Sequence, residues 1–226
     1  MTYSVLAQPA KISRLFTWAE LDINMYLLEA QMSIKFVVTL PTKRDGLGEL
    51  MVFDTITSAA VLGPFPCLGT AVSSAARENG NDALEMTKNY GHTPDGGYDV
   101  VGTIGPDPVG SANRRSYGPN ARFKLVGVSG AAQLRQANID ARGEKPLRIH
   151  GGHQEQGPYK PSPGEVGGFV KTYGCLRMAD GDIAALLSYI QDNGITYSLS
   201  MEVRSGVVQV VGVLFDGDDV DVDPGE

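Results

Sequence analysis

A cysteine and two histidines lie close enough in the sequence to suggest nucleophilic catalysis. Cys175 follows a glycine within residues 172–178, and His150 and His153 lie upstream of it. A free thiol with a pKa of ~8.5 is mostly protonated at neutral pH, so it needs a base, a cation or a helix N-terminus that favours its thiolate. Either histidine could be that base, and Cys175 would then be the nucleophile.

The peptide groups around Cys175 suit an attack on a carbonyl carbon. Gly174 leaves space beside the sulfur for a substrate backbone, and nearby N–H groups could stabilise the oxyanion that forms. A zinc site is the competing interpretation, because His150, His153 and Cys175 would supply three ligands. No second cysteine or acidic residue stands at a matching spacing, so we predict no metal and no cofactor. A third interpretation leaves Cys175 as an inert core residue and the histidines as ordinary loop residues.

Three neighbouring elements must position these side chains. The alternation in residues 147–150 predicts a short strand that delivers His150 at its end, and a loop rich in glycine and proline follows over residues 151–171. After Cys175, Asp180 or Asp182 is expected to cap a helix that stops at residues 193–194. The apolar face of that helix is formed by Ile183, Leu186, Leu187 and Ile190.

The rest of the chain favours short strands joined by turns, because it contains 28 glycines and 13 prolines. Residues 34–40 and 49–54 are predicted to form a hairpin, and residues 196–203 and 207–215 to pair through a turn at 205–206. Further predictions are strands at 98–103 and 123–128, a turn at 64–69, a short helix and loop at 73–93, and a long loop at 105–120 with Arg114, Arg115 and Tyr117. The predicted fold class is mostly β with short helices (α+β).

Composition limits the classes of partner. Charged residues make up 20% and hydrophobic residues 42% of the chain, which is ordinary for a globular protein. A net charge of −7 without a cluster of Lys and Arg argues against nucleic acid, and no run approaches the ~20 apolar residues of a membrane span. The remaining cysteine, Cys67, is predicted to be a small buried hydrophobe, and His92 a solvated loop residue.

Two segments resemble the catalytic motif of the L,D-transpeptidase (YkuD-like) family. Residues 149–151 read Ile-His-Gly and residues 172–178 read Thr-Tyr-Gly-Cys-Leu-Arg-Met, whereas the family carries Ile-His-Gly followed by Ser/Thr-His-Gly-Cys-Ile/Leu-Arg-Met. Residues 93–98 are similar to its Thr-Pro-x-Gly-x-Tyr element, and residues 63–66 to an earlier Gly/Pro turn. Tyr173 departs from the family pattern, as does the interval from His150 to Cys175, which is 175 − 150 = 25 positions.

The resemblance implies a β-sandwich or barrel catalytic domain that transfers acyl groups of peptidoglycan tetrapeptide stems. Cys175 would attack the carbonyl of the third stem residue and expel the terminal D-alanine. A second amine or water would then resolve the thioester, which gives L,D-transpeptidase, D-amino-acid exchange or L,D-carboxypeptidase activity. The resemblance makes His150 the general base, with His153 as its rival, and N–H groups of Tyr173, Gly174 and Cys175 the oxyanion donors.

Four residues are expected to bind substrate through the same resemblance, namely Arg177, His153, Thr172 and Gly151. Arg177 would orient the motif or a substrate carboxylate, or form a structural salt bridge. The expected domains are a helical extension at residues 1–33, an L,D-transpeptidase-like catalytic domain at 34–214 and a disordered acidic tail at 215–226.

The implied substrate lies in the periplasm or cell wall, yet residues 1–10 show no recognisable secretory signal. We therefore expect either a signal that was removed or export without one, as an antibacterial effector of a type VI secretion system. A secretion carrier and an immunity protein would then be partners. Two alternatives stay open, which are an inactive peptidoglycan-binding module of the same fold and a cysteine peptidase acting on other substrates.

Overall fold

The computed structural model describes residues 33–152, 165–166, 169–196 and 199–208. The chain divides into two units, Met1–Met32 and Ser33–Glu226, and the described residues all belong to the second. The predicted acidic tail lies outside the described residues, as does the predicted helical extension except for Ser33.

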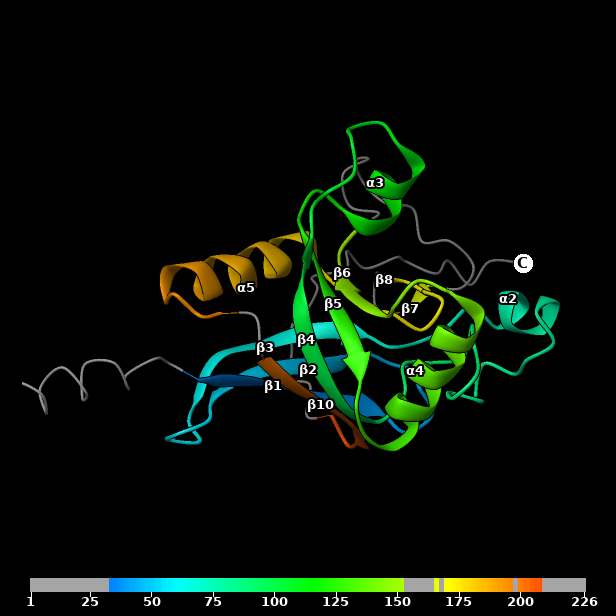
Figure 1. Cartoon of the computed structure of the whole chain (residues 1–226), viewed down its shortest axis with the longest axis horizontal. Coiled ribbons are helices and arrows are strands. Elements are labelled where there is room, and N and C mark those ends of the chain that lie inside the picture. The colour runs from blue at the N-terminus through cyan, green and yellow to red at the C-terminus, as the bar shows by residue number, and fades with distance from the viewer. Residues whose placement is uncertain (1–32, 153–164, 167–168, 197–198, 209–226) are drawn as a thin grey trace, which may run out of the picture. The chain divides into compact units, whose positions relative to one another are not determined.

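Eight strands close into a barrel in the order β1-β10-β4-β5-β6-β9-β3-β2 (Figure 1). Their bounds are β1 (Ile34–Pro41), β2 (Gly48–Asp54), β3 (Ala60–Leu68), β4 (Gly96–Ile104), β5 (Arg122–Gly127), β6 (Arg148–His150), β9 (Leu176–Met178) and β10 (Leu199–Gly206). A separate two-stranded sheet joins β7 (Glu165–Val166) to β8 (Phe169–Val170). The helices are α2 (Ser73–Glu78), α3 (Ala112–Tyr117), α4 (Gly130–Arg142) and α5 (Asp180–Asp192). The predicted mostly β class with short helices is confirmed.

The barrel core follows from the period of two that a strand imposes on its side chains. In β10, Leu199, Met201 and Val203 are buried while the residues between them are exposed. Buried apolar side chains of the other strands complete the core, and the rings of Phe36 and Phe123 meet edge to face with centroids 5.9 Å apart. The predicted hairpin of residues 34–40 and 49–54 is confirmed as the antiparallel pair of β1 and β2.

Two segments that were predicted as turns belong to strands of the barrel. The expected turn at 205–206 is wrong, because β10 continues to Gly206 and lies between β1 and β4. Its expected partner strand lies outside the described residues from residue 209 onward. The expected turn at 64–69 is also wrong, since residues up to Leu68 belong to β3. Prolines are tolerated there because β3 pairs with β9 only at Cys67 and Leu68, so both prolines lie where β3 has β2 as its single neighbouring strand.

Two helices lie in segments where no helix was predicted. The long loop at 105–120 contains α3, where the Ser111 hydroxyl accepts a hydrogen bond of 3.0 Å from the Arg114 N–H as an N-cap. Residues 130–142 form α4, which buries Ala132, Arg135 and Ile139 on one face and ends at Gly143 with φ +64. Figure 1 shows α4 lying along β4 and β5, on the other side of the barrel from α5.

Helix α5 follows β9 directly and has the predicted apolar face. Ile183, Leu186 and Ile190 are buried. The predicted cap is wrong, because Ala179 is the N-cap and its side chain makes no capping bond. Asp180 instead turns its carboxylate outward from the helix and accepts a hydrogen bond of 2.7 Å from the Gly152 N–H. No helix among the described residues is long and apolar enough to cross a membrane.

Candidate active site

The parallel pairing of β6 with β9 brings the predicted nucleophile and base to one face of the barrel. Ile149 pairs with Leu176, and His150 pairs with Arg177. Side chains alternate along a strand, so His150 shares its face with Arg177. Cys175, two residues before Arg177, lies on the same face. Strand spacing and rise put the Cα atoms of His150 and Cys175 about 8 Å apart. Ile149 and Leu176 point the other way and are fully buried in the core.

His150 is a neutral imidazole with a defined tautomer. Its Nδ1 lies 2.7 Å from the carbonyl oxygen of Gly151, which can only accept a hydrogen bond, so Nδ1 carries the proton and Nε2 keeps its lone pair. Burial and the charge of Arg177 hold the pKa of His150 well below its usual range. A free lone pair on Nε2 is what a general base requires.

Cys175 is a free, partly exposed thiol immediately before β9. Burial raises its pKa, and this effect outweighs a hydrogen bond from the backbone of Arg148 and the charges of Arg148, Arg177 and Arg135, which lower it. The resting site therefore holds a neutral thiol beside a neutral imidazole. This direction is opposite to the lowered thiol pKa that a reactive cysteine led us to expect.

Hydroxyl groups fix the backbone of the segment that carries the thiol. The Thr172 hydroxyl donates to the Cys175 carbonyl at 2.7 Å and accepts from the Gly174 N–H at 3.2 Å. The Thr93 hydroxyl lies 3.0 Å from the Gly174 carbonyl and 3.2 Å from that of Cys175. Because the Gly174 N–H is already engaged, the expected oxyanion donors narrow to the N–H groups of Tyr173 and Cys175.

Arg177 forms hydrogen bonds with the two glycines that follow His150. Its Nη1 donates to the carbonyl of Gly151 at 3.1 Å and to that of Gly152 at 3.2 Å. Gly151 has no room for a side chain, since a Cβ there would collide with the carboxylate of Asp180. The same carbonyl of Gly151 thus receives hydrogen bonds from His150 and Arg177, which orients the imidazole.

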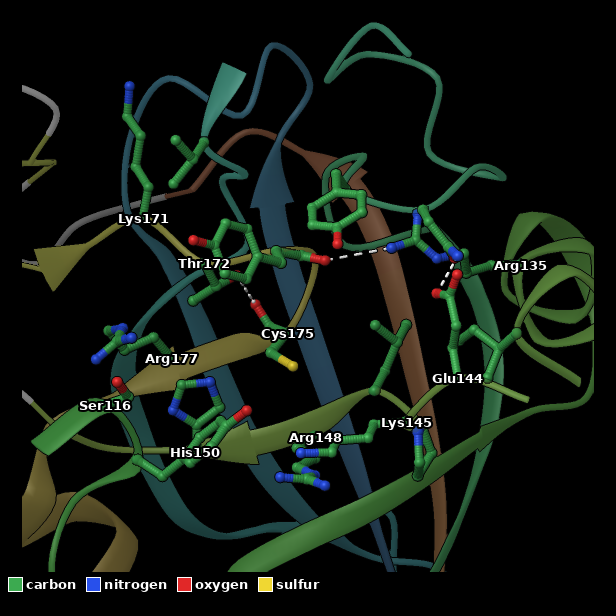
Figure 2. Close-up of a pocket in the computed structure, with 18 of the residues that line it drawn as sticks. Ser116, Arg135, Glu144, Lys145, Arg148, His150, Lys171, Thr172, Cys175 and Arg177 are labelled. Atoms are coloured by element: carbon green, nitrogen blue, oxygen red, sulfur yellow. Dashed lines mark hydrogen bonds between the residues drawn. The ribbon is translucent and has the colours of Figure 1, made fainter. Parts of the chain in front are cut away.

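A cleft of about 810 Å³ opens over this face (Figure 2). His150 and Cys175 line this cleft. Three other predicted site residues line it as well, namely Thr172, Tyr173 and Arg177. Tyr173 is 59% exposed, its ring meets that of Tyr90 at 5.3 Å, and its carbonyl accepts a hydrogen bond from Arg135. Tyr173 therefore lies at the mouth of the cleft and offers an aromatic surface where the family pattern has a basic residue.

The cleft is cationic although the whole chain carries a net charge of −7. Five positive side chains line it, and Glu144 is the single carboxylate among its lining residues. The positive residues are Arg135, Lys145, Arg148, Lys171 and Arg177. Clustered charge of one sign in a concave site raises the local concentration of ligands of the opposite sign, so the cleft suits an anionic ligand.

Sequence reasoning gave no role to two residues of this site, Arg148 and Arg135. Arg148 stands two positions before His150, so the predicted strand already placed both side chains on one face. Tyr117 of α3, which was noted only in a loop, contacts the His150 ring edge to face with centroids 4.9 Å apart. Arg135 comes from the unpredicted helix α4, so no sequence signal connected it with Cys175.

The remaining predicted site residue is His153, and the other cysteine and histidine of the chain, Cys67 and His92, were predicted to lie outside the site. His153 falls in the undescribed segment 153–164, so the choice between His153 and His150 as general base stays a prediction. Cys67 is fully buried in β3, as predicted, and burial raises its pKa strongly. His92 is buried rather than solvated, because its Nδ1 accepts a hydrogen bond of 2.8 Å from the Ala71 N–H. Within the described ranges no group of three metal-ligating side chains is found.

Comparison with known proteins adds no family assignment. No family model matches the sequence, and no curated protein matches it. The resemblance to L,D-transpeptidases therefore stays a prediction from the quoted motifs, to be weighed with the geometry of the cleft.

Proposed function

We propose that the protein is a cysteine acyltransferase that acts on peptidoglycan tetrapeptide stems, with Cys175 as nucleophile and His150 as general base. The observation that supports this most is the shared face of β6 and β9, where a thiol and an unprotonated Nε2 line one cleft. Such a substrate lies in the cell wall, so the protein would act outside the cytoplasm.

The chemistry follows from the neutral resting pair. As a stem peptide binds, the thiol proton passes to Nε2 of His150 while the sulfur bonds to the carbonyl carbon of the third residue. Collapse of the tetrahedral intermediate breaks the peptide bond, and the imidazolium returns its proton to the leaving amine of D-alanine. An amine or water then attacks the thioester and regenerates the thiol.

The charge of the cleft supports an acidic substrate. Stem peptides carry carboxylates, and five cationic side chains line the cleft against one carboxylate. Guanidinium groups bind carboxylates through paired hydrogen bonds, which gives orientation as well as attraction. The exposed ring of Tyr173 at the mouth offers an apolar surface to the rest of the ligand.

The decisive experiment measures D-alanine released from a synthetic tetrapeptide stem and from purified sacculi, with and without an added D-amino acid as acceptor. We expect release by the wild-type protein and a loss of at least about a thousandfold in Cys175→Ala, because nothing else in the site replaces the nucleophile. Cys67→Ala is the matched control, since Cys67 is a buried cysteine outside the cleft, and it should retain release.

Three outcomes would contradict the proposal in different ways. Release that survives in Cys175→Ala would exclude the thioester. Binding to sacculi without any release would favour the inactive binding module, which the raised pKa of Cys175 makes a specific competitor. Cleavage of ordinary proteins without D-alanine release would favour a cysteine peptidase.

A further inference from the structure

Arg148 is a buried guanidinium without an oxygen partner among the described residues. It is 8% exposed, its Nε has no hydrogen-bond partner, and none of the described carboxylates forms an ion pair with it. The buried Arg44 and Arg122 differ, because each has an aspartate at 2.6 Å. A buried charge without a counter-ion is costly, and an anion that enters the cleft would reduce that cost.

Arg148 contacts the ring of Tyr117, which orients its guanidinium group but accepts no conventional hydrogen bond from its N–H groups. Its Cζ lies 5.1 Å from the ring centroid of Tyr117, and Arg122 lies over the same ring at 4.6 Å. Arg122 is neutralised by Asp107, whereas the N–H groups of Arg148 are left for the cleft that it lines. A cation held against an aromatic ring keeps its plane but still needs acceptors for five N–H groups.

Arg148 also lies next to the sulfur. One step back from the pair of Ile149 and Leu176, the register sets Arg148 beside Cys175, and the backbone of Arg148 hydrogen-bonds the thiol. Both side chains belong to the cleft face together with His150, as Figure 2 shows. An anion bound by Arg148 would therefore lie close to any carbonyl that Cys175 attacks.

We propose that Arg148 forms a carboxylate-binding site for the free C-terminal carboxylate of the acyl donor, which restricts the reaction to the last peptide bond. This rests on the proposed acyl transfer at Cys175. In a peptide, the carboxylate carbon of the leaving residue lies less than about 4 Å from the attacked carbon, a separation that neighbouring Arg148 and Cys175 side chains can span. The forked guanidinium matches the two carboxylate oxygens.

A first test needs no peptide substrate, so it is independent of the proposed function. Iodoacetate and iodoacetamide both alkylate a thiolate, with a sulfur–carbon bond formed, iodide released and the thiol proton lost to solvent, but only iodoacetate carries a carboxylate. We expect the ratio of their rates at Cys175 to exceed the ratio for free cysteine by at least about tenfold, because the carboxylate of iodoacetate would accept charge-assisted hydrogen bonds from Arg148.

Variants separate Arg148 from the general positive charge of the cleft. Arg148→Gln should bring the ratio close to that of free cysteine, and Arg148→Lys should retain part of it, since Lys keeps the charge without the fork. Lys145→Gln is the matched control, because Lys145 is an exposed cation that lines the same cleft, and it should change the ratio less than about threefold. The ratio cancels any change in thiolate fraction. A wild-type ratio equal to that of free cysteine would overturn the proposal even if Arg148→Gln does not fold.

A second test uses the proposed reaction. Release from a tetrapeptide with a free terminal carboxylate is compared with release from the same peptide as its terminal amide. We expect the wild-type protein to prefer the acid by at least about tenfold and Arg148→Gln to lose that preference. Equal rates for the two peptides, both abolished in Cys175→Ala, would leave the acyltransferase standing and overturn the role of Arg148. No release from either peptide, together with a raised iodoacetate ratio, would keep the carboxylate site and contradict the proposed substrate.

Discussion

The thiol and the imidazole of the cleft are both uncharged at rest because each is kept from its ionised form by burial. The pKa of Cys175 is raised and that of His150 is lowered. In the proposed reaction, an ion pair of thiolate and imidazolium would form only when a substrate is attacked, which differs from cysteine sites whose thiolate is stable at neutral pH. Reactivity of this thiol should depend strongly on pH.

We predict that alkylation of Cys175 by iodoacetamide has a pH midpoint above that of free cysteine. The thiolate is the reacting form, and a raised pKa leaves less thiolate at pH 7, so the rate should increase as pH rises through the raised midpoint. Mass spectrometry of the modified peptide against pH measures the midpoint, with free cysteine as reference. A midpoint below that of free cysteine would show that the nearby arginines outweigh burial.

For single residues, the sequence predicted which side chains would lie in the site but not the directions in which their pKa values shift. Cys175 and His150 were predicted as nucleophile and base from their neighbours in the chain, and the structure brings both to one cleft. The burial that sets their pKa values depends on Tyr117, Arg135 and other residues distant in sequence. His92 was wrongly predicted as solvated, because the Ala71 N–H that binds it lies 21 positions away.

The segment of residues 172–175 is held rigidly by residues of other elements. The Thr93 hydroxyl lies within hydrogen-bond distance of two of its carbonyls, and Arg135 of α4 donates to the carbonyl of Tyr173. Gly174 has φ +106, and a Cβ there would lie 2.8 Å from the Gly91 carbonyl and 2.9 Å from Nη2 of Arg135. The glycine before the thiol is thus required by packing as well as by backbone conformation.

We predict that Gly174→Ala destabilises the protein by about 1–3 kcal/mol more than Gly102→Ala. Gly102 has φ +141 but no atom within 4 Å of its would-be Cβ, so it is a matched control for backbone strain without crowding. Urea unfolding followed by circular dichroism gives both free energies of unfolding. Equal losses in the two variants would mean that the neighbours of Gly174 move aside freely.

Elements were predictable where a single period dominated the sequence. Strands β1, β2, β4 and β5 were predicted from their apolar, β-branched and aromatic content, and helix α5 from its repeating apolar residues. Helix α4 was missed because its polar surface hides a buried stripe of only three residues, one of which is Arg135. Strand β3 was read as a turn because its prolines mask its pairing with β2.

A partly buried ion pair links parts of the barrel that are distant in sequence. Arg44 is 1% exposed and contacts Asp95 at 2.6 Å, and its other N–H groups donate to the Pro41 carbonyl and the Ser205 hydroxyl. Asp95 in turn accepts from the Ser205 hydroxyl at 2.6 Å. The turn between β1 and β2, the turn before β4 and the end of β10 are thereby joined.

We predict that Asp95→Asn destabilises the protein by about 1–2 kcal/mol, because Arg44 is buried and loses its counter-ion, while solvent screens the partly exposed carboxylate of Asp95. Asp99→Asn is the matched control, since Asp99 is an exposed residue of β4, and it should change the free energy of unfolding by less than about 0.5 kcal/mol. Chemical denaturation measures both. A loss at Asp95 no larger than at Asp99 would show that carbonyl oxygens alone stabilise Arg44.

Closure of the barrel was beyond local sequence reasoning. A period of two tells which face of a strand is buried, but it does not tell which strands are neighbours. The pairs of β1 with β10 and of β6 with β9 are parallel and join distant parts of the chain. The active-site register therefore emerged only from the assembled sheet.

The parallel register of β6 and β9 also removes a constraint on how this cleft can diversify. Hydrogen bonds between the two strands, rather than the length of chain between them, set the distance from His150 to Cys175. The interval of 175 − 150 = 25 positions can lengthen or shorten while the two reactive groups keep their places. Under the proposed acyl transfer, insertions and deletions there would be a route to new substrate preferences that leaves the catalytic step intact.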